Sequence, residues 1–180
     1  MTQTVPLHTQ LQALYNGGAV QRFHTVRTVQ RQTVADHSWG VASLLLLITN
    51  GNASRDLLAA ALHHDLGEQW TGDVPSPTKR YATIGVQLAA LEREQRLRAG
   101  LQEFKLSPAE EQLLDFTDNL DGMLFCLEEF KLGNRNAQLW FSRYSRYNDE
   151  HPALKVGCAR DVYQVVHRAF LTAGGVYVTG

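Results

Sequence analysis

One segment limits the fold more than any other: residues 107 to 132, which open with the letters SPAE. Serine is a favoured N-cap, proline suits the first helical position, and glutamate suits the first turn. The segment runs on to Leu132 and stops at Gly133, so it predicts one long helix. No stretch of the chain alternates apolar and polar residues over more than a few positions, as half-buried strands do. We therefore expect an all-α protein with helices packed around a shared core.

The other helices are expected from their start and stop signals. Thr33 and Asp36 have the spacing of a capping box, the helix after them ends near Asn50, and Ser54 caps the next helix. The expected helices cover about 7–15, 33–50, 54–64, 82–99, 107–132, 136–147 and 152–173, with a loop rich in glycine and proline over 66–78. This organisation predicts a single bundle of about six to eight helices.

Length and composition limit the function. The 180 residues favour one domain over the whole chain, 1–180, and 44% hydrophobic with 19% charged residues is ordinary for a globular protein. A formal net charge of −1 offers no basic surface for a nucleic-acid polymer or an anionic membrane, although it leaves room for a small anionic ligand. We expect Cys126 and Cys158 to be reduced thiols, because they lack C-x-x-C spacing.

The sequence also predicts a cytoplasmic location. The first ten residues, MTQTVPLHTQ, lack the charged and apolar regions of a signal peptide. The longest apolar run, LLLLI at 44–48, is far too short to cross a bilayer. We therefore expect no membrane partner.

The stretch LHHDLGEQWTGDVPSP, at 62–77, gathers acidic and imidazole side chains where a helix ends. His64 and Asp65 fall at the C-terminal end of that helix, where the helix dipole disfavours an aspartate by about 0.3–1 kcal/mol. A divalent cation would offset this cost. The alternative is a solvated aspartate beside a histidine of the core.

Two more residues extend this pair into a pattern H…HD…D. His37 lies in the first turn of its helix beside an apolar face, and Asp118 lies inside the long helix on the flank of an apolar stripe. Taken alone, His37 could equally be a histidine packed in the core. For Asp118, burying an unpaired carboxylate would cost roughly several kcal/mol, so this residue is expected to be either exposed or paired. Two imidazoles and two carboxylates suit Co, Mn, Zn or Fe better than Ca. We find no P-loop, dinucleotide-binding, H-E-x-x-H or G-x-S-x-G motif.

Several stretches resemble the HD-domain phosphohydrolase superfamily, which is all-helical. They are R-F at 22–23, TVADHSWGVA at 33–42, HHDLGE at 63–68, TGDVPSPTK at 71–79 and DNLDGMLFCLEEFKLGN at 118–134. In order and spacing they are similar to the bacterial 5′-deoxynucleotidases of that superfamily. The opening LYNGGAVQRFHTV is similar to phage-encoded HD proteins that act as dATP triphosphohydrolases. The resemblance spans about residues 20–135. HD enzymes that hydrolyse the alarmone ppGpp have a second acidic residue where this chain has Gln69, so the nucleotidase branch fits better.

The resemblance implies a metal held by His37, His64, Asp65 and Asp118, with a possible additional Mg. Glu68, four residues after His64, is expected to act as general base or to orient the attacking water. Its alternative is an exposed glutamate at a helix end.

Four other residues are assigned with the same resemblance in mind. Asp73 is expected to help hold the water, a second cation or the sugar, or else it only forms a turn. Arg22 is a candidate phosphate clamp, since guanidinium matches phosphate in bidentate fashion. Phe23 takes the place of an aromatic that reads the deoxyribose or stacks on the nucleoside, with core packing as its alternative. Lys79 is expected at the outer phosphates of a triphosphate, or else in solvent.

Three functional hypotheses follow. The first is a dATP triphosphohydrolase, encoded by a phage and acting in the host cytoplasm. The second is a 5′-deoxynucleotidase acting on monophosphates. The third is a non-catalytic HD module that senses a nucleotide. The resemblance also implies a homo-oligomer with a small-molecule deoxynucleotide as partner. The run SRYSRY at 142–147 is expected to put Tyr144 and Tyr147 at a packing or subunit surface.

Overall fold

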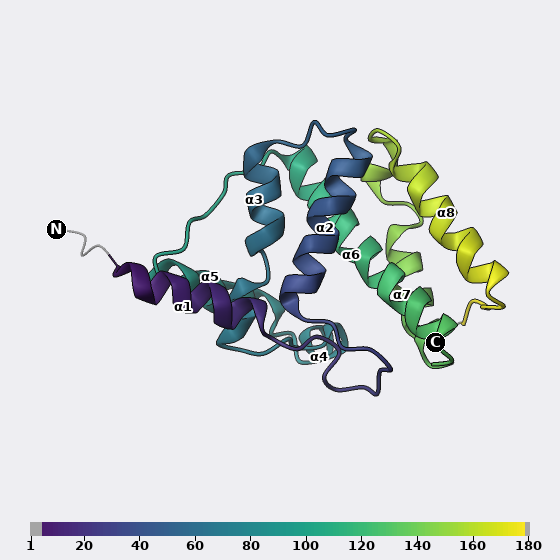
Figure 1. Cartoon of the computed structure of the whole chain (residues 1–180), viewed down its shortest axis with the longest axis horizontal. Coiled ribbons are helices and arrows are strands. Elements are labelled where there is room, and N and C mark those ends of the chain that lie inside the picture. Colours follow the sequence, from purple (N-terminus) through teal and green to yellow (C-terminus); the bar gives the residue numbers. More distant parts are fainter. Residues whose placement is uncertain (1–4, 179–180) are drawn as a thin grey trace.

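The computed structural model describes residues 5–178, except the side chain of Arg80, as helices joined by loops (Figure 1). The α-helices are α1 (Leu7–Gly18), α2 (Val34–Ile48), α3 (Arg55–His63), α4 (Ser76–Tyr81), α5 (Gly85–Arg98), α6 (Pro108–Lys131), α7 (Ala137–Asn148) and α8 (Ala159–Thr172). Two 3₁₀ turns are η1 (Leu66–Gln69) and η2 (Pro152–Lys155). Within the described range, β pairing is limited to one isolated bridge between Gln21 and Thr33. The all-α fold class is confirmed, and the outermost residues of the predicted domain 1–180 lie outside the described part.

The capping signals form as the sequence predicts. The Thr33 side chain accepts from the Asp36 amide, and the Asp36 carboxylate accepts from the Thr33 amide at 2.9 Å. Ser107 and Glu110 form the same reciprocal pair at the start of α6. Ser54 caps α3 and also donates to Glu110 at 2.6 Å, so the starts of α3 and α6 are joined. Each cap satisfies backbone donors that the first helical turn leaves free.

The predicted helix over 152–173 is wrong in its first part. The chain forms only the short turn η2, and α8 begins at Ala159. Gly157 separates them with φ +47°, and a Cβ at that position would collide with the carbonyl oxygen of Ile48. A glycine here lets the chain turn tightly against the end of α2, which a continuous helix could not do.

The segment predicted as a loop over 66–78 also differs. Its beginning is the turn η1, and its end already belongs to α4, which starts at Ser76. Thr83 has φ +52°, a backbone conformation that interrupts the helix between α4 and α5. The predicted helix over 82–99 therefore begins only at Gly85. The additional turn η1 matters because it carries part of the candidate site.

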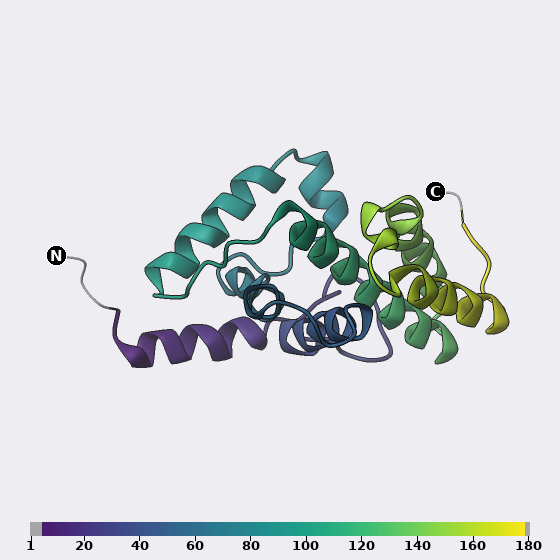
Figure 2. The same cartoon turned by 90° about the horizontal axis from the view of Figure 1, so that it is seen from above.

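The main core forms around α6, which runs through the middle of the molecule with α2 and α7 against it (Figures 1 and 2). Its largest fully buried side chains include Phe116, Leu120 and Met123 from α6. Phe141 of α7 and Phe170 of α8 stack with ring centroids 3.9 Å apart. Burying side chains of this size contributes about 1.5–3 kcal/mol each, which makes α6 a rigid support for what it carries.

The opposite end of the molecule has a smaller core. Its buried residues are Ala13 of α1, Leu66 of η1, and Ala99 and Leu101 at the end of α5. Figure 1 shows α1 lying near α5 at this end, far from α8. The turn η1 is thus held from both sides.

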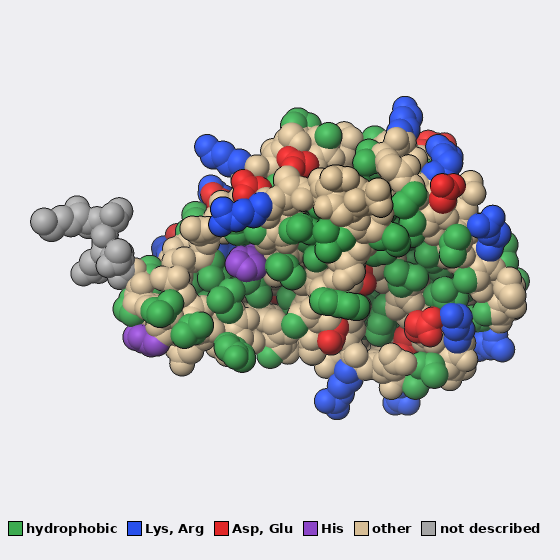
Figure 3. Space-filling model, turned by 45° about the horizontal axis from the view of Figure 1, so that its top comes forward, with side chains coloured by type: hydrophobic (Ala, Val, Ile, Leu, Met, Phe, Trp, Pro, Cys, Tyr) green, Lys and Arg blue, Asp and Glu red, His purple; other side chains and the backbone are tan. Residues whose placement is uncertain are grey.

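The surface has no region of one charge sign on the face seen in Figure 3, where acidic and basic side chains are scattered in ones and twos. Several of them pair, as Arg93 does with Glu103 and Arg98 with Glu94. Among residues 5–178, no helix has both the length and the apolar character that a membrane span requires.

Candidate active site

Three helices bring the four predicted metal ligands together. His37 lies in the first turn of α2, His64 is the residue that ends α3, and Asp65 follows it. One ligand atom from each of these three lies within 4.8 Å of the others. Asp118, inside α6, approaches the same point, with its Oδ1 2.9 Å from His37 Nε2. The pattern H…HD…D therefore folds into one cluster.

Hydrogen bonds on the far side of each imidazole orient the two rings. His37 Nδ1 lies 2.6 Å from Asp121 Oδ2, and His64 Nδ1 lies 2.7 Å from the Ala61 carbonyl oxygen. A carbonyl oxygen only accepts, so His64 Nδ1 carries the hydrogen and donates it. The two Nε2 atoms are turned toward each other, 3.3 Å apart, and Asp65 Oδ2 is 3.4 Å from His64 Nε2. Metal-binding histidines usually have this arrangement.

The charges of the cluster favour a cation. Burial and nearby Arg22 oppose protonation of His37, but its hydrogen bonds to Asp118 and Asp121 prevail and raise its pKa to about 9. Burial works against ionisation of Asp118, yet the contact with His37 lowers the pKa of this carboxyl below its usual range. In the metal-free protein, a proton on His37 balances these carboxylates at neutral pH. A divalent cation would take the place of that proton.

Glu68 lies where η1 returns the chain over Asp65. Its amide donates to the Asp65 carbonyl at 3.0 Å, and residues three apart eclipse each other in a 3₁₀ turn. The side chain is buried, its Oε2 has no hydrogen-bond partner among residues 5–178, and Lys79 Nζ is 3.8 Å from Oε1. Burial, together with the charges of Asp65 and Asp73, raises the pKa of Glu68 to about 9. Such a carboxyl holds its proton at neutral pH in the metal-free protein, and a pKa shifted this far is typical of functional sites.

Arg22 and Phe23 enter the site from the loop between α1 and α2. Arg22 Nη1 donates to Asp65 Oδ2 at 2.8 Å, and its Nε is buried with no partner in the described part of the chain. Phe23 has φ +53°, a conformation that is rare for a bulky residue and that gathers at functional sites. The Phe23 amide donates to Asp73 Oδ2 at 3.1 Å. Asp73 thus ties the TGDVP turn to this loop.

One cavity of about 530 Å³ collects the predicted residues. It is lined by Arg22, Phe23, Asp65, Glu68, Asp73, Lys79 and Asp118, and by further residues of α6 and α7. The Phe23 ring lines it while stacking on Phe125, with centroids 4.6 Å apart, so its core-packing and ligand-facing roles are combined. His37 and His64 join the cavity through their contacts with Asp65 and Asp118.

The SRYSRY run lines the cavity as well as packing on α6. Tyr144 and Tyr147 line the cavity, together with Trp140 and Arg143 of the same helix. Tyr144 also packs on α6, where a Cβ at Gly122 would come within 2.7 Å of its ring. The signal was available, because Trp140, Tyr144 and Tyr147 are spaced by four and three residues and so share one helix face.

Two buried residues, Asp121 and Gln32, lie behind His37 and were not identified from the sequence. Asp121 accepts from Gln32 Nε2 at 3.0 Å as well as contacting His37, and Gly40 leaves room for its carboxylate. Asp121 follows Asp118 by three residues on α6, so the sequence contained a second acid on the same helix face. Gln32 is 89 residues away from Asp121, and nothing in the sequence relates the two.

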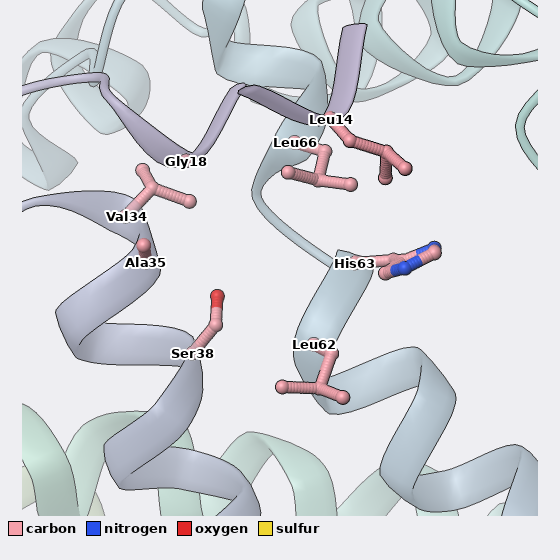
Figure 4. A pocket seen from close by; sticks show the side chains of 8 residues that line it. All are labelled: Leu14, Gly18, Val34, Ala35, Ser38, Leu62, His63 and Leu66. Carbon is pink, nitrogen blue, oxygen red and sulfur yellow. The ribbon is translucent and has the colours of Figure 1, made fainter. Parts of the chain in front are cut away.

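A second, smaller cavity lies between α1, α2 and α3 (Figure 4). Its volume is about 200 Å³, and its lining is Leu14, Gly18, Val34, Ala35, Ser38, Leu62, His63 and Leu66. Figure 4 shows the Ser38 hydroxyl directed into the space between the helices. The lining contains no carboxyl group and one imidazole, that of His63, so it forms no cluster of ligands like the one in the larger cavity.

The residues of the larger cavity fit a divalent metal. Both imidazoles keep their Nε2 atoms free of any backbone partner, and two carboxylates lie beside them. Nitrogen and oxygen ligands in this mixture suit Zn or another transition metal. His37, His64 and Asp65 could hold the ion, with Asp118 beside His37. The fold and this site define a metal-dependent phosphohydrolase of the HD type.

Comparison with known proteins identifies the family. The model of a family described as 5′-deoxynucleotidase YfbR-like matches residues 11–154. A 5′-deoxynucleotidase of Cronobacter sakazakii is 31% identical over 150 residues, 71% of this chain and 75% of its own length. A 5′-deoxynucleotidase of Vibrio vulnificus is 32% identical over 143 residues, 67% of this chain and 74% of its own. The chain belongs to the YfbR-like 5′-deoxynucleotidase family of HD-domain proteins.

Two solved structures share the fold. The PH0347 protein of Pyrococcus horikoshii is 21% identical with a TM-score of 0.66, covering 91% of this chain and 99% of its own. The HD phosphohydrolase DatZ of cyanophage S-2L is 20% identical with a TM-score of 0.53, covering 95% of this chain and 98% of its own. That second structure contains dA and one catalytic Zn²⁺ ion. These two structures show the fold, and membership of the family makes the protein a metal-dependent HD-domain nucleotide phosphohydrolase.

Proposed function

We propose that the protein hydrolyses deoxynucleoside triphosphates, with dATP as its main substrate. One observation carries the proposal: a single cavity joins the metal-ligating cluster to Arg22, Lys79 and Arg143 on its walls. Arg22 already pairs with Asp65, so Lys79 and Arg143 are the cations left to meet further phosphates. The relation in fold to a cyanophage enzyme bound to dA supports the nucleoside part of the proposal.

The proposed chemistry divides among the residues of the cavity. A divalent cation, when bound by His37, His64, Asp65 and Asp118, would polarise a phosphoryl oxygen and acidify a water molecule. Glu68 is assigned to receive the proton from that water. Its pKa of about 9 in the metal-free protein would fall beside a cation, because a nearby positive charge favours the carboxylate.

The remaining side chains hold the substrate. Arg22 presents guanidinium donors that match a phosphate, and its pairing with Asp65 keeps them directed at the cluster. Asp73 acts on Phe23 by accepting from its amide, so we assign it to positioning the aromatic ring against the sugar. Lys79 would neutralise outer phosphates, and its Nζ also lies near Glu68.

A second candidate is hydrolysis of deoxynucleoside monophosphates. The relatives that are 31–32% identical are 5′-deoxynucleotidases, and they match most of the chain. In this case Lys79 is a surface residue without a role in substrate binding. A nucleotide sensor without catalysis is a third candidate, and the buried Glu68 beside the cluster disfavours it.

One experiment separates the candidates. The purified protein is incubated with each dNTP, each dNMP and ATP, with Co, Mn, Zn, Fe or Mg added, and released phosphate, pyrophosphate and triphosphate are measured. Selective loss of dATP is the expected result. Turnover of monophosphates alone would overturn the triphosphatase proposal and favour the second candidate. Binding without turnover under every metal would favour the sensor.

We also propose that the protein is a homo-oligomer in the cytoplasm, and in a phage-infected host cell if the gene is a phage gene. Large apolar side chains are exposed on α1 and α2: Leu7, Tyr15 and Trp39 are each at least 70% exposed. Apolar groups exposed to this degree often mark contact surfaces. Light scattering coupled to size exclusion would test assembly, and a monomer at every concentration would contradict it.

A further inference from the structure

The cavity has a second polar group besides the metal cluster, formed by two residues of α6 near Asp118. Asp115 and Asn119 both line the cavity, on either side of Asp118 in the sequence. Asp115 precedes Asp118 by three residues, so their side chains are neighbours on one helix face. Neither Asp115 nor Asn119 belongs to the group of potential metal ligands. Both are free to contact another part of the substrate.

The hydrogen bonds of Asp115 leave one oxygen available. Its Oδ2 accepts from the Tyr147 hydroxyl at 2.7 Å and contacts His151 Nε2 at 3.1 Å. No described residue donates to its Oδ1. Tyr147 belongs to α7 and His151 directly precedes η2, so both groups that hold this carboxylate come from outside α6. The free oxygen can only accept a hydrogen bond when the group is ionised.

Asn119 presents an acceptor for a similar reason. Its Nδ2 donates to the Asp115 carbonyl oxygen at 2.8 Å. Because that partner can only accept, the amide orientation is determined, and the carbonyl oxygen Oδ1 is the group left free. Asp115 and Asn119 therefore each keep an acceptor oxygen without a described partner, on a part of α6 that lines the cavity.

The part of the lining that α7 contributes is aromatic. Trp140, Tyr144 and Tyr147 of α7 line the cavity, and the Phe23 ring lies 5.9 Å from the Trp140 ring. Flat apolar surfaces suit a nucleobase, and acceptors suit the amino group at its edge. Arg143 is the donor on this helix face, and its side chain is exposed.

We propose that Asp115 and Asn119 form a base-recognition subsite that selects nucleotides whose base has an exocyclic amino group. The aromatic face of α7 holds the plane of the base, and the two acceptors bind its amino hydrogens. This inference rests on the proposed hydrolysis of deoxynucleotides and names the feature of the base that the site reads. A base with a carbonyl oxygen at the same position would face two acceptors and lose both hydrogen bonds.

The test compares substrates that differ only in this group. We would measure kcat/KM for dATP against dITP, which have the same ring size but carry amino and oxo groups, and for dCTP against dUTP. The corresponding monophosphates serve if the triphosphates are not hydrolysed. Wild-type protein is expected to prefer the amino member of each pair by about 10-fold, the value of one or two partly exposed hydrogen bonds.

Two variants locate the preference. In Asp115→Asn, the remaining oxygen would stay with Tyr147 and His151, and the new amide would turn a donor toward the base. The dATP to dITP ratio should therefore fall to about 1 or reverse, while bound metal is unchanged. Asn119→Ala should lower the ratio by removing one acceptor without changing the charge. Glu111→Gln, an exposed residue one turn before Asp115, is the matched control and should keep the wild-type ratio.

The outcomes separate the two proposals. If no nucleotide is hydrolysed, the proposed function itself fails. If dATP and dITP are hydrolysed equally well, hydrolysis stands and the base-recognition subsite is wrong. A preference for dITP would also overturn it and would point to Arg143 as the group that contacts the base. If Asp115→Asn unfolds, as judged by circular dichroism, the ratio in Asn119→Ala decides.

Discussion

Two cavities flank the helices α2 and α3, and they differ in chemistry although they are built from adjacent residues. His37 belongs to the acidic cluster and Ser38 lines the smaller cavity, while His64 and His63 divide in the same way. Adjacent residues of a helix diverge by about 100°, so neighbours in the sequence can face different spaces. The two cavities share no lining residue.

The comparison shows that the reactivity of a cavity depends on which charged side chains line it. The larger cavity combines carboxylates with Arg22 and Lys79, and burial shifts the pKa of Glu68 there to about 9. In the smaller one, burial lowers the pKa of His63, and the rest of the lining is mainly aliphatic. Substitutions on the two sides of α2 and α3 should therefore have unlike effects.

The largest effect is expected at the metal cluster. Asp65→Asn keeps the shape of the side chain but removes a charge that pairs with Arg22 and faces His64. We expect loss of bound metal and a fall in kcat of at least about 10³-fold, since the cation is needed to activate water and to stabilise charge. Metal analysis by mass spectrometry and phosphate release would measure both. Full activity with full metal content would remove Asp65 from the ligand set.

Glu68→Gln should affect catalysis and leave metal binding in place. We expect kcat to fall about 10²- to 10³-fold with little change in KM, as is typical when a general base is removed. The matched control is Glu111→Gln, which makes the same change at an exposed glutamate outside the cavity lining. A Glu68→Gln protein as active as wild type would exclude the assigned role.

Glu68→Gln should also change how the free energy of unfolding depends on pH. The pKa of Glu68 is raised from 4.5 in the unfolded chain to about 9 in the folded protein, so the folded state binds the proton more tightly. Its contribution to the free energy of unfolding is full below pH 4.5 and is lost as pH rises toward 9. Metal-free Glu68→Gln should therefore be the more stable protein at pH 8, by about 1–3 kcal/mol, and nearly equal at pH 5. Thermal melts at both values would test this, and an equal difference at both would contradict it.

Asp121→Asn should have a smaller effect on the metal. This residue holds His37 Nδ1 and does not belong to the potential ligand group. We expect a 10- to 100-fold weaker metal affinity, roughly, because the ring loses the carboxylate that fixes its orientation. Calorimetric titration of the metal-free protein with Zn²⁺ would measure it. An unchanged affinity would show that the cluster orients His37 without Asp121.

The smallest effect is expected in the smaller cavity. The Ser38 hydroxyl is buried and has no hydrogen-bond partner among residues 5–178. Ser38→Ala therefore removes a buried polar group that makes no hydrogen bond. We expect unchanged kcat and a stability equal to wild type or higher by about 1 kcal/mol. A clear loss of activity would mean that the two cavities are coupled and that the contrast between them is wrong.

Several features followed from the sequence alone. The capping pairs at Thr33 and Ser107 set the starts of α2 and α6 through contacts within four residues, and such local contacts need no tertiary structure. The pattern His37, His64, Asp65 and Asp118 was recognisable because its residue types suit a cation and because it resembles the pattern of HD-domain phosphohydrolases. The roles assigned to Glu68, Asp73, Arg22, Phe23 and Lys79 stay predictions, although the fold brings all five to one cavity.

Other features were decided only by tertiary structure. The pairing of Asp121 with Gln32 spans 89 residues, and the contact of Asp115 with Tyr147 spans 32, so no local signal contains either. Gly157 breaks the last predicted helix because the chain must pass the carbonyl of Ile48, a neighbour that only folding supplies. Short-range hydrogen bonds and residue chemistry are written in the sequence, whereas the partners of a buried polar group depend on how separate helices pack.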